Sequence, residues 1–365
     1  MSKRLTFALV ALTVSLSVIA AACAPAPAPT EVMPEPTEAM PEPTEAPAMP
    51  EVGSPEHPIK VLFVPSVDAN VIVTGGEVMA NALNEATGLT FEVSVPTSYA
   101  ATIEEMCASP TDTMAFIPGL GYGLASQLCG VDVAFKAVRF GYSVYWAQFL
   151  VPRDSDIQSL EDLEGKKWGF GDPGSTSGYM VPLVMFQEAG ITPGEQVQTG
   201  GHNQSVQAVY DGEVDFATTF FSWPTAVDTG DSIEDTAHPD IPDDLVDSCG
   251  LNADGNLVCG NYRVRDARAN IREGAPDVVQ KVRILMISGD IPNDTLSFSP
   301  DFPADVRAQI EEALVAFAET EAWGESIGHQ DFYDWSGIAP STDSEYDVIR
   351  AMVNATGLTL EKLGE

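Results

Sequence analysis

A short polar loop, Gly-Asp-Pro-Gly-Ser-Thr-Ser-Gly at residues 171–178, is the segment best suited to chemistry. It joins an apolar run with strand character to a helical run. Its glycines let the backbone approach a ligand closely, and Ser175, Thr176 and Ser177 supply hydroxyl donors beside the free N–H groups of a helix start. The pattern predicts an anion cradle without a cationic side chain. A simple Ser/Thr helix cap is the alternative, although three consecutive hydroxyl residues exceed what one cap needs.

The loop lacks the marks of two common catalytic loops. No Gly-Lys-Ser/Thr follows it, which excludes a Walker A phosphate loop. The central position of residues 174–178 is Thr176, where a G-x-S-x-G nucleophile elbow carries Ser. Carboxylates are abundant, but no nucleophile–base constellation stands out, and we assign no catalytic residue and no cofactor.

His202 follows the next predicted strand, at a second strand-to-helix junction. An imidazole there can share an oxyanion with the first loop, whether it is neutral or protonated. The alternative is a histidine that caps the helix or packs in the loop. A metal role is not favoured, because the other histidines lie in the tether region or in acidic loops: His57, His238 and His329.

Tyr99 and Tyr122 each open a helix after a strand in the first half of the chain. A phenol donates one hydrogen bond and also forms a wall for a pocket. The alternative for each is structural, because a single tyrosine at such a position more often packs at the boundary of the core. Trp223 with the adjacent Phe220 and Phe221 can line a cleft, but aromatic clusters are more often part of the core.

The elements that must position these residues alternate between strand and helix from residue 58 onward. Strands are predicted at residues 59–64, 89–95, 113–117, 131–138, 143–151, 166–170, 197–200, 214–219 and 281–287. Helices are predicted at residues 75–87, 98–107, 121–128, 179–189, 203–210, 304–318 and 345–355. This alternation indicates an α/β fold with largely parallel sheets. Ligands of such folds bind beyond the carboxyl ends of strands, where the candidate residues lie.

Net charge limits the classes of partner. The chain of 365 residues has a formal net charge of −37. A polymer of phosphates is repelled by most of such a surface, so we do not expect nucleic-acid binding. An anionic ligand must therefore be attracted by local donors.

The first 23 residues have the plan of an export signal. Lys3 and Arg4 precede an apolar stretch that ends in three alanines and Cys23, an order that resembles a bacterial lipobox with Ala20 where many carry Leu. An ordinary signal peptide cleaved near Ala22 and a membrane-spanning helix are the alternatives. Residues 24–56 repeat MPEPTEA twice, as expected for an extended tether between a lipid anchor and a domain.

Four further cysteines make an even number in an exported chain, which favours disulfides. Cys249 and Cys259 flank a predicted hairpin with an Asp254-Gly255 turn, and this turn would place them opposite each other. Cys107 and Cys129 then pair by elimination. A metal site is the alternative, but no CxxC motif is present.

The chain resembles the phosphate-, phosphite- and phosphonate-binding components of ABC importers, within the type II periplasmic binding proteins. The most specific match is residues 160–167 (LEDLEGKK) followed by residues 171–182 (GDPGSTSGYMVP). Further matches are residues 60–65, Tyr99, residues 114–125, 202–215, 291–294 and 342–350. The resemblance covers most of residues 58–358 and leaves residues 228–265 as a divergent or inserted stretch.

The resemblance implies two lobes joined by two hinge strands, near residues 145–152 and 284–292. Residues 57–147 and 291–365 would form one lobe and residues 148–290 the other. The phosphoryl oxygens would be held by Tyr99, Tyr122, Ser175, Thr176, Ser177 and His202. The implied partners are a small oxyanion and an ABC permease, with the protein a monomer held outside the cytoplasm on the cell membrane.

One departure bears on the ligand. Binders of aminoalkylphosphonates need an acidic residue for the ligand ammonium, yet no carboxylate occurs between Asp215 and Asp228. The sequence therefore favours phosphite, phosphate, methylphosphonate or another small oxyanion. The alternatives are a sulfonate or thiamine-like ligand in the same fold, a hydrolase that uses Ser175 or Ser177 with His202, and a sensory ligand-binding module.

Overall fold

The computed structural model describes residues 50–363. The export signal, Cys23 and most of the tether lie outside the described residues. Residues 50–56, which the sequence assigns to the tether, form turns on the domain, because the carbonyl of Gly53 accepts a hydrogen bond from the Thr90 N–H at 2.7 Å. Among residues 50–363, none of the helices combines the length and hydrophobicity of a membrane-spanning segment.

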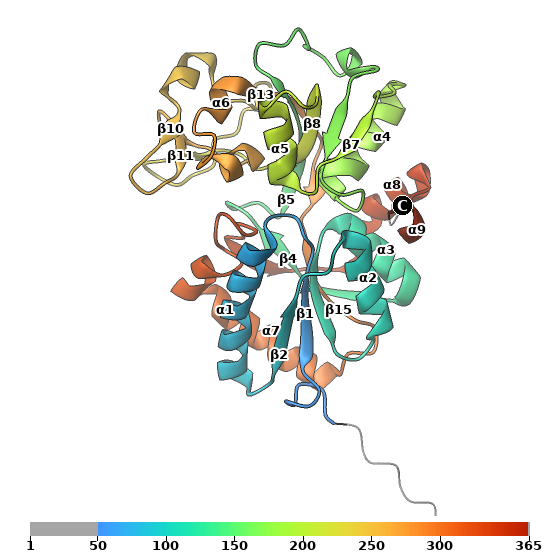
Figure 1. Ribbon diagram of the computed structural model, residues 1–365. Helices are drawn as coiled ribbons and strands as arrows, with labels where there is room; N and C mark the ends of the chain where they lie inside the picture. The colour runs from blue at the N-terminus through green and yellow to red at the C-terminus, as the bar shows by residue number, and fades with distance from the viewer. Residues whose placement is uncertain (1–49, 364–365) are drawn as a thin grey trace, which may run out of the picture. The chain divides into compact units, whose positions relative to one another are not determined.

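A mixed sheet forms the centre of what we call the first lobe (Figure 1). Its strand order is β16-β4-β15-β3-β1-β2. The strands are β1 (Ile59–Phe63), β2 (Phe91–Ser94), β3 (Thr113–Ile117), β4 (Asp132–Val138), β15 (Thr295–Phe298) and β16 (Gly337–Pro340). The helices of this lobe are α1 (Ala69–Thr87), α2 (Tyr99–Ala108), α3 (Gly119–Cys129), α7 (Ala304–Ala318), α8 (Asp347–Thr356) and α9 (Leu360–Leu363).

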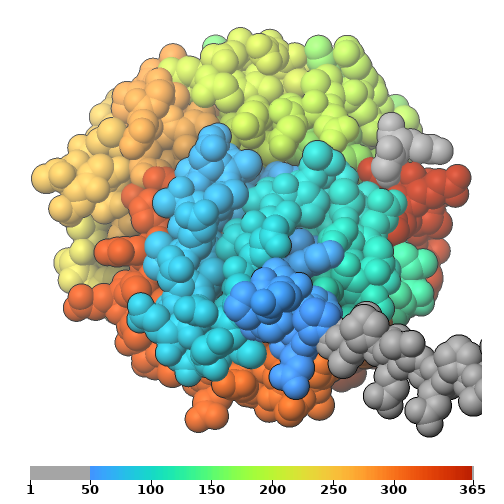
Figure 2. Space-filling view, turned by 60° about the horizontal axis from the view of Figure 1, so that its bottom comes forward, coloured from blue at the N-terminus to red at the C-terminus, as the bar shows by residue number. Residues whose placement is uncertain are grey.

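Helix α1 shows how local sequence sets an element of this lobe. The Asp68 side chain caps the helix by accepting from the Asn70 N–H, and Gly88 ends it with a φ of 73°. Ile72, Met79 and Leu83 are fully buried against the sheet. Figure 2 shows this helix in blue beside segments from the C-terminal part of the chain in orange, which shows that distant parts of the sequence build the first lobe together.

A second sheet forms the centre of the second lobe, with strand order β13-β5-β8-β6-β7. Its strands are β5 (Val144–Pro152), β6 (Trp168–Phe170), β7 (Gln196–Gln198), β8 (Phe216–Phe221) and β13 (Val282–Ile287). Its helices are α4 (Val181–Ala189), α5 (His202–Tyr210) and α6 (Val278–Lys281). Helix α4 is preceded without a break by a π-helical turn, Thr176–Met180.

The prediction of largely parallel sheets is only half right. Strands β1, β2 and β3 are mutually parallel, as are β6, β7 and β8. In contrast, β15 runs antiparallel to β3 and β4, and β5 runs antiparallel to β8 and β13. Strands β5 and β15 each follow a crossing between the two sheets, whereas β16, which runs antiparallel to β4, follows α7 within the first lobe.

Two crossings join the lobes. The chain leaves the first sheet after β4 and enters β5; it returns through β13, β14 (Ile291–Pro292) and β15. Strand β5 pairs with β14 at its start and with β13 further along. The segments predicted as hinges, near residues 145–152 and 284–292, overlap β5 and β13–β14, and their action as hinges stays a prediction.

A four-stranded antiparallel sheet fills the divergent stretch of the second lobe. It consists of β9 (Thr225–Ala226), β10 (Gly250–Leu251), β11 (Leu257–Cys259) and β12 (Tyr262–Arg263). Gly255 takes a φ of 74° in the hairpin between β10 and β11, and Cys249 is bonded to Cys259 across it. A second disulfide joins Cys107 on α2 to Cys129 on α3.

Candidate ligand-binding site

A cavity between the two lobes gathers four of the six ligand-binding residues that the sequence predicts. Tyr99 comes from the start of α2 in the first lobe, whereas Ser175, Ser177 and His202 come from strand-to-helix junctions in the second lobe. All four side chains are buried. The cavity offers about 70 Å³ to the centres of water-sized molecules.

The hydroxyl loop turns tightly at the start of its helix. The Ser175 side chain accepts a hydrogen bond from the Gly178 N–H at 3.1 Å, so this serine caps the helix. Its hydroxyl hydrogen stays available to a ligand. Thr176 and Ser177 are the first residues of the helical run, where backbone N–H groups have no partner within the helix. The helix cap is therefore present, and it does not use up the hydroxyl hydrogens and backbone N–H groups from which the anion cradle is predicted.

Two glycines let neighbouring groups approach this loop. A side-chain carbon on Gly174 would lie 2.5 Å from Cβ of Tyr99, and one on Gly178 would lie 3.3 Å from the His202 ring. Real carbon contacts are not so short, so only glycine fits at Gly174 without a shift of Tyr99. The glycines thus serve contacts within the site, between the loop and its two flanking donors.

His202 is a neutral imidazole at pH 7. Burial, helped by the charge of Arg139, lowers the pKa of His202 to about 4. Its ring lies edge-on to Phe220, with the ring centres 5.2 Å apart. Nδ1 is buried and has no hydrogen-bond partner among residues 50–363. An imidazole in a Ser-His-Asp triad needs an acid bonded to its second nitrogen, and no described residue supplies one.

Thr176 and Tyr122 do not line the cavity. Oγ1 of Thr176 accepts a hydrogen bond from the Leu120 N–H of the first lobe at 2.8 Å. The Tyr122 hydroxyl donates to Asp343 at 2.7 Å, and its ring packs edge-on against Tyr346. Both side chains are fully buried away from the lining, because each serves a contact inside the protein.

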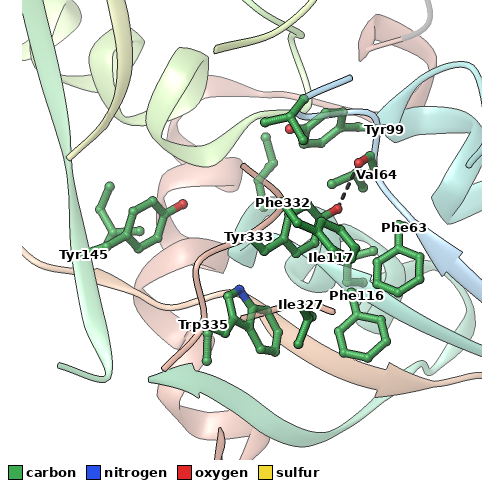
Figure 3. Packing of buried hydrophobic residues seen from close by; sticks show 14 of the residues in the cluster. Phe63, Val64, Tyr99, Phe116, Ile117, Tyr145, Ile327, Phe332, Tyr333 and Trp335 are labelled. Atoms are coloured by element: carbon green, nitrogen blue, oxygen red, sulfur yellow. Dashed lines mark hydrogen bonds between the residues drawn. The ribbon is translucent and has the colours of Figure 1, made fainter. Parts of the chain in front are cut away.

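Tyr145 is a lining residue that the sequence analysis did not select. It projects from β5 toward Tyr333, as Figure 3 shows, while Tyr99 lies nearer to Val64. Burial raises the pKa of the Tyr145 phenol well above its ordinary range, and burial does the same for Tyr99. Both phenols therefore stay protonated and can donate. The position of Tyr145 on a predicted hinge strand was the signal that could have identified it.

Charged side chains also line the cavity, which corrects the expectation of a site without cations. The lining includes Arg139, Arg265, Arg272, Asp294 and Asp334. Arg139 pairs with Asp294 at 2.7 Å. No carboxylate lies between Asp215 and Asp228, but Asp294 and Asp334 reach the cavity from distant segments. Among residues 50–363, no group of three or more metal-ligating side chains is arranged to hold a metal ion.

Further contacts cross between the lobes around the cavity. The backbone N–H of His202 donates to the Ser66 carbonyl at 3.3 Å. Arg272 of the second lobe forms an ion pair with Asp331 of the first lobe at 2.7 Å. Together with the Leu120–Thr176 bond, these contacts hold the two walls of the cavity against each other.

Comparison with known proteins identifies the family. The family model described as "ABC transporter, phosphonate, periplasmic substrate-binding protein" matches residues 61–346. The phosphate-import protein PhnD of Mycolicibacterium smegmatis is 25% identical over 321 residues, which are 84% of this chain and 87% of that protein. The phosphonates-binding periplasmic protein of Escherichia coli is 38% identical over 111 residues, which are 27% of this chain and 32% of that protein.

Solved structures confirm the two-lobed fold. A binding component of an ABC phosphonate transporter from Pseudomonas aeruginosa has a TM-score of 0.61 at 17% identity, covering 80% of this chain and 84% of that one. PhnD1 from Prochlorococcus marinus, solved with methylphosphonate, has a TM-score of 0.60 at 13% identity, covering 82% of this chain and 98% of that one. The chain therefore belongs to the family of periplasmic phosphonate-binding proteins of ABC transporters, and the predicted fold class and family are confirmed.

Proposed function

We propose that this protein captures a phosphonate, phosphite or phosphate in the cavity between its lobes and delivers it to an ABC permease. The observation that carries the proposal is the convergence of Ser175, Ser177 and His202 with Tyr99 on one buried cavity. We propose these four residues and Tyr145 as the ligand-binding set. Thr176 is assigned to the contact between lobes, and Tyr122 to the interior of the first lobe.

The donors suit an oxyanion because each offers a hydrogen without carrying a charge. Two serine hydroxyls, two protonated phenols and a neutral imidazole can each donate one hydrogen bond. Since Nδ1 of His202 is buried without a partner, the proton is best placed on Nε2. Hydrogen bonds from such groups to an anion contribute about 1.5–3 kcal/mol each. The helix start adds backbone N–H groups and a favourable dipole.

The size of the cavity favours a small ligand. A buried water requires about 10–15 Å³ on this measure, so the cavity of about 70 Å³ holds roughly five waters. Phosphate and methylphosphonate have five non-hydrogen atoms each. A ligand much larger than these would require the lobes to separate further.

Ligand binding would act through the relative position of the lobes. The residues 57–147 and 291–365 would move as one lobe against residues 148–290, about the two crossings at β5 and β13–β14. A ligand favours the closed arrangement only through contacts that it makes there and not in the open one. Tyr99 on one lobe and Ser177 on the other supply such contacts.

We also propose that Cys23 carries a lipid, that residues 24–49 tether the domain to the outer face of the cell membrane, and that the domain acts as a monomer. The apolar stretch before Cys23 and the Pro-rich repeats support the anchor. Expression of the full chain in a bacterial host tests it. A Cys23→Ala variant should leave the membrane fraction, and its retention there would contradict the proposal.

Titration calorimetry with methylphosphonate, phosphite, phosphate, sulfate and an alkylsulfonate tests the ligand class. We expect saturable binding of at least one phosphorus compound and weaker binding of both sulfur compounds. Preference for a sulfonate, or turnover of a chromogenic phosphate or carboxyl ester, would overturn the proposed function.

A further inference from the structure

Three arginines line the cavity, and two of them are fully engaged by the protein. In Arg139, Nε donates to the Tyr333 carbonyl at 3.1 Å, one terminal nitrogen donates to Asn293, and the other pairs with Asp294 at 2.7 Å. In Arg272, Nε donates to the Gly255 carbonyl at 2.8 Å, and both terminal nitrogens reach Asp331 at 2.7 and 3.2 Å. Every nitrogen of these two guanidinium groups already donates to a protein acceptor.

Arg265 is different. Its Nε donates to Oγ1 of Thr225 at 3.1 Å, and its guanidinium lies over the Phe140 ring at 4.3 Å from the ring centre. The nearest carboxylate oxygen, Oδ2 of Asp334, is 3.7 Å from Nη1, which is too far for a hydrogen bond. Among the residues that the structure describes, the two terminal amino groups of Arg265 therefore have no hydrogen-bond acceptor.

A largely buried guanidinium whose terminal donors have no protein acceptor carries a desolvation cost, and an acceptor supplied by a ligand lowers that cost. The Arg265 side chain is only 13% exposed. Burial lowers the pKa of Arg265 to about 10, against the opposing effect of Asp334 and with a contribution from Arg263. The side chain thus remains charged at neutral pH and faces the cavity with four N–H bonds free.

The charges around this end of the cavity leave an excess of positive charge. Asp294 compensates Arg139, and Asp331 compensates Arg272. Asp334 lies beside both Arg265 and Arg263; burial raises the pKa of Asp334, and the charges of these two arginines oppose that rise. One carboxylate is thus shared by two guanidinium groups. A ligand oxygen is favoured at this position, and a ligand ammonium is opposed there.

We propose that Arg265 binds oxygen atoms of the ligand directly and makes the protein select phosphorus oxyanions without an amine over aminoalkylphosphonates. This inference rests on the proposed function, because it assumes that a phosphorus oxyanion occupies the cavity. The sequence alone favours this selectivity only through the absence of a carboxylate between Asp215 and Asp228. Arg265 adds a side chain that favours ligand oxygens directly. The carboxylate of Asp334 does not reverse it, since that group is already shared by two cations.

Calorimetry on Arg265→Met with methylphosphonate and 2-aminoethylphosphonate as probes tests the inference. Arg263→Met is the matched control, because it removes the same charge nearby from a residue that bonds to Gln330 and does not line the cavity. We expect Arg265→Met to weaken methylphosphonate binding at least tenfold and Arg263→Met less than threefold. The preference of the wild type for methylphosphonate over 2-aminoethylphosphonate should shrink in Arg265→Met alone.

The outcomes separate the two proposals. If the wild type binds phosphorus oxyanions but Arg265→Met binds them equally well, or both variants lose equally, Arg265 is not a ligand contact. A wild type that prefers 2-aminoethylphosphonate overturns the selectivity. If the wild type binds no phosphorus oxyanion, the proposed function itself fails. Arg265→Lys keeps the positive charge but not the planar set of guanidinium donors. An affinity for methylphosphonate between those of the wild type and Arg265→Met would show that the loss in Arg265→Met is not a folding defect.

Discussion

The backbone N–H of Leu120 donates a 2.8 Å hydrogen bond to Oγ1 of Thr176, across the boundary between the two lobes. Leu120 lies in the first turn of α3, and Thr176 opens the helical run that leads into α4. The three adjacent hydroxyl residues therefore make different contacts. The two serines line the cavity, and the threonine between them fastens the cradle to the opposite lobe.

Replacing Thr176 by Val should weaken ligand binding without touching the cavity. The Leu120 N–H would stay buried without an acceptor in the closed arrangement, at a cost of about 1–3 kcal/mol, whereas water would satisfy it in the open one. We expect a roughly 5- to 150-fold rise in the dissociation constant by calorimetry. Thr176→Ser keeps the hydroxyl and should bind almost as the wild type does. Equal effects of Val and Ser would show that the bond is not the cause.

The double variant Ser175→Ala and Ser177→Ala should lose most of the affinity. Each hydroxyl is expected to give a charge-assisted bond of about 1.5–3 kcal/mol, so the dissociation constant should rise by roughly 10²- to 10⁴-fold. Ser248→Ala serves as a control, because that hydroxyl donates to the Leu245 carbonyl at an exposed position. Unchanged affinity in the double variant would remove the hydroxyl loop from the site.

Tyr145→Phe and Tyr122→Phe should separate the two tyrosines. Tyr145 lines the cavity, so loss of its hydroxyl should weaken ligand binding about tenfold. Tyr122→Phe removes the bond to Asp343 and should lower the free energy of unfolding by about 1 kcal/mol while binding stays within threefold. Calorimetry and urea unfolding of both variants decide the matter. A loss of affinity in Tyr122→Phe alone would reverse the assignment.

The buried His202 should make stability depend on pH. Its pKa is about 4 in the folded protein against 6.5 for the free side chain. Between these values the unfolded chain binds a proton that the folded protein does not, so the free energy of unfolding falls as the pH falls from 6.5 toward 4. The total should approach about 3.5 kcal/mol, at about 1.4 kcal/mol per pKa unit.

Urea unfolding of the wild type and His202→Asn at several pH values between 4.5 and 7.5 measures this contribution. Other groups titrate in the same range, so the relevant quantity is the difference between the two proteins. The stability of the wild type should decline relative to that of the variant as the solution becomes more acidic. Parallel curves would mean that His202 titrates normally in the folded state.

Local signals in the sequence predicted most of the longer helices and strands and four of the residues that line the cavity. The strand at residues 113–117 and the helix at residues 304–318 have the bounds that the sequence predicts. The residue types of the loop at residues 171–178 predict its place beside the cavity, because Ser175 and Ser177 line it. The antiparallel strand β15 could not be placed from local pattern, since its partners β3 and β4 lie far away in the sequence.

The charged lining depends on tertiary contacts that leave no local trace. Arg139 and Asp294 meet because the two crossings between the lobes lie side by side, and Arg265 reaches the cavity from a stretch that looked inserted. Tyr122 was favoured because it opens a helix after a strand. The same reasoning does not reveal which way a side chain points, and Tyr122 points toward Asp343.

A crystal structure of the wild type grown with methylphosphonate tests the central claim most directly. We predict the phosphorus atom inside the cavity between the lobes, with its oxygens within hydrogen-bonding distance of Ser175, Ser177 and His202. A phosphonate bound elsewhere on the protein, or one held in the cavity without contact to these three side chains, would contradict the account.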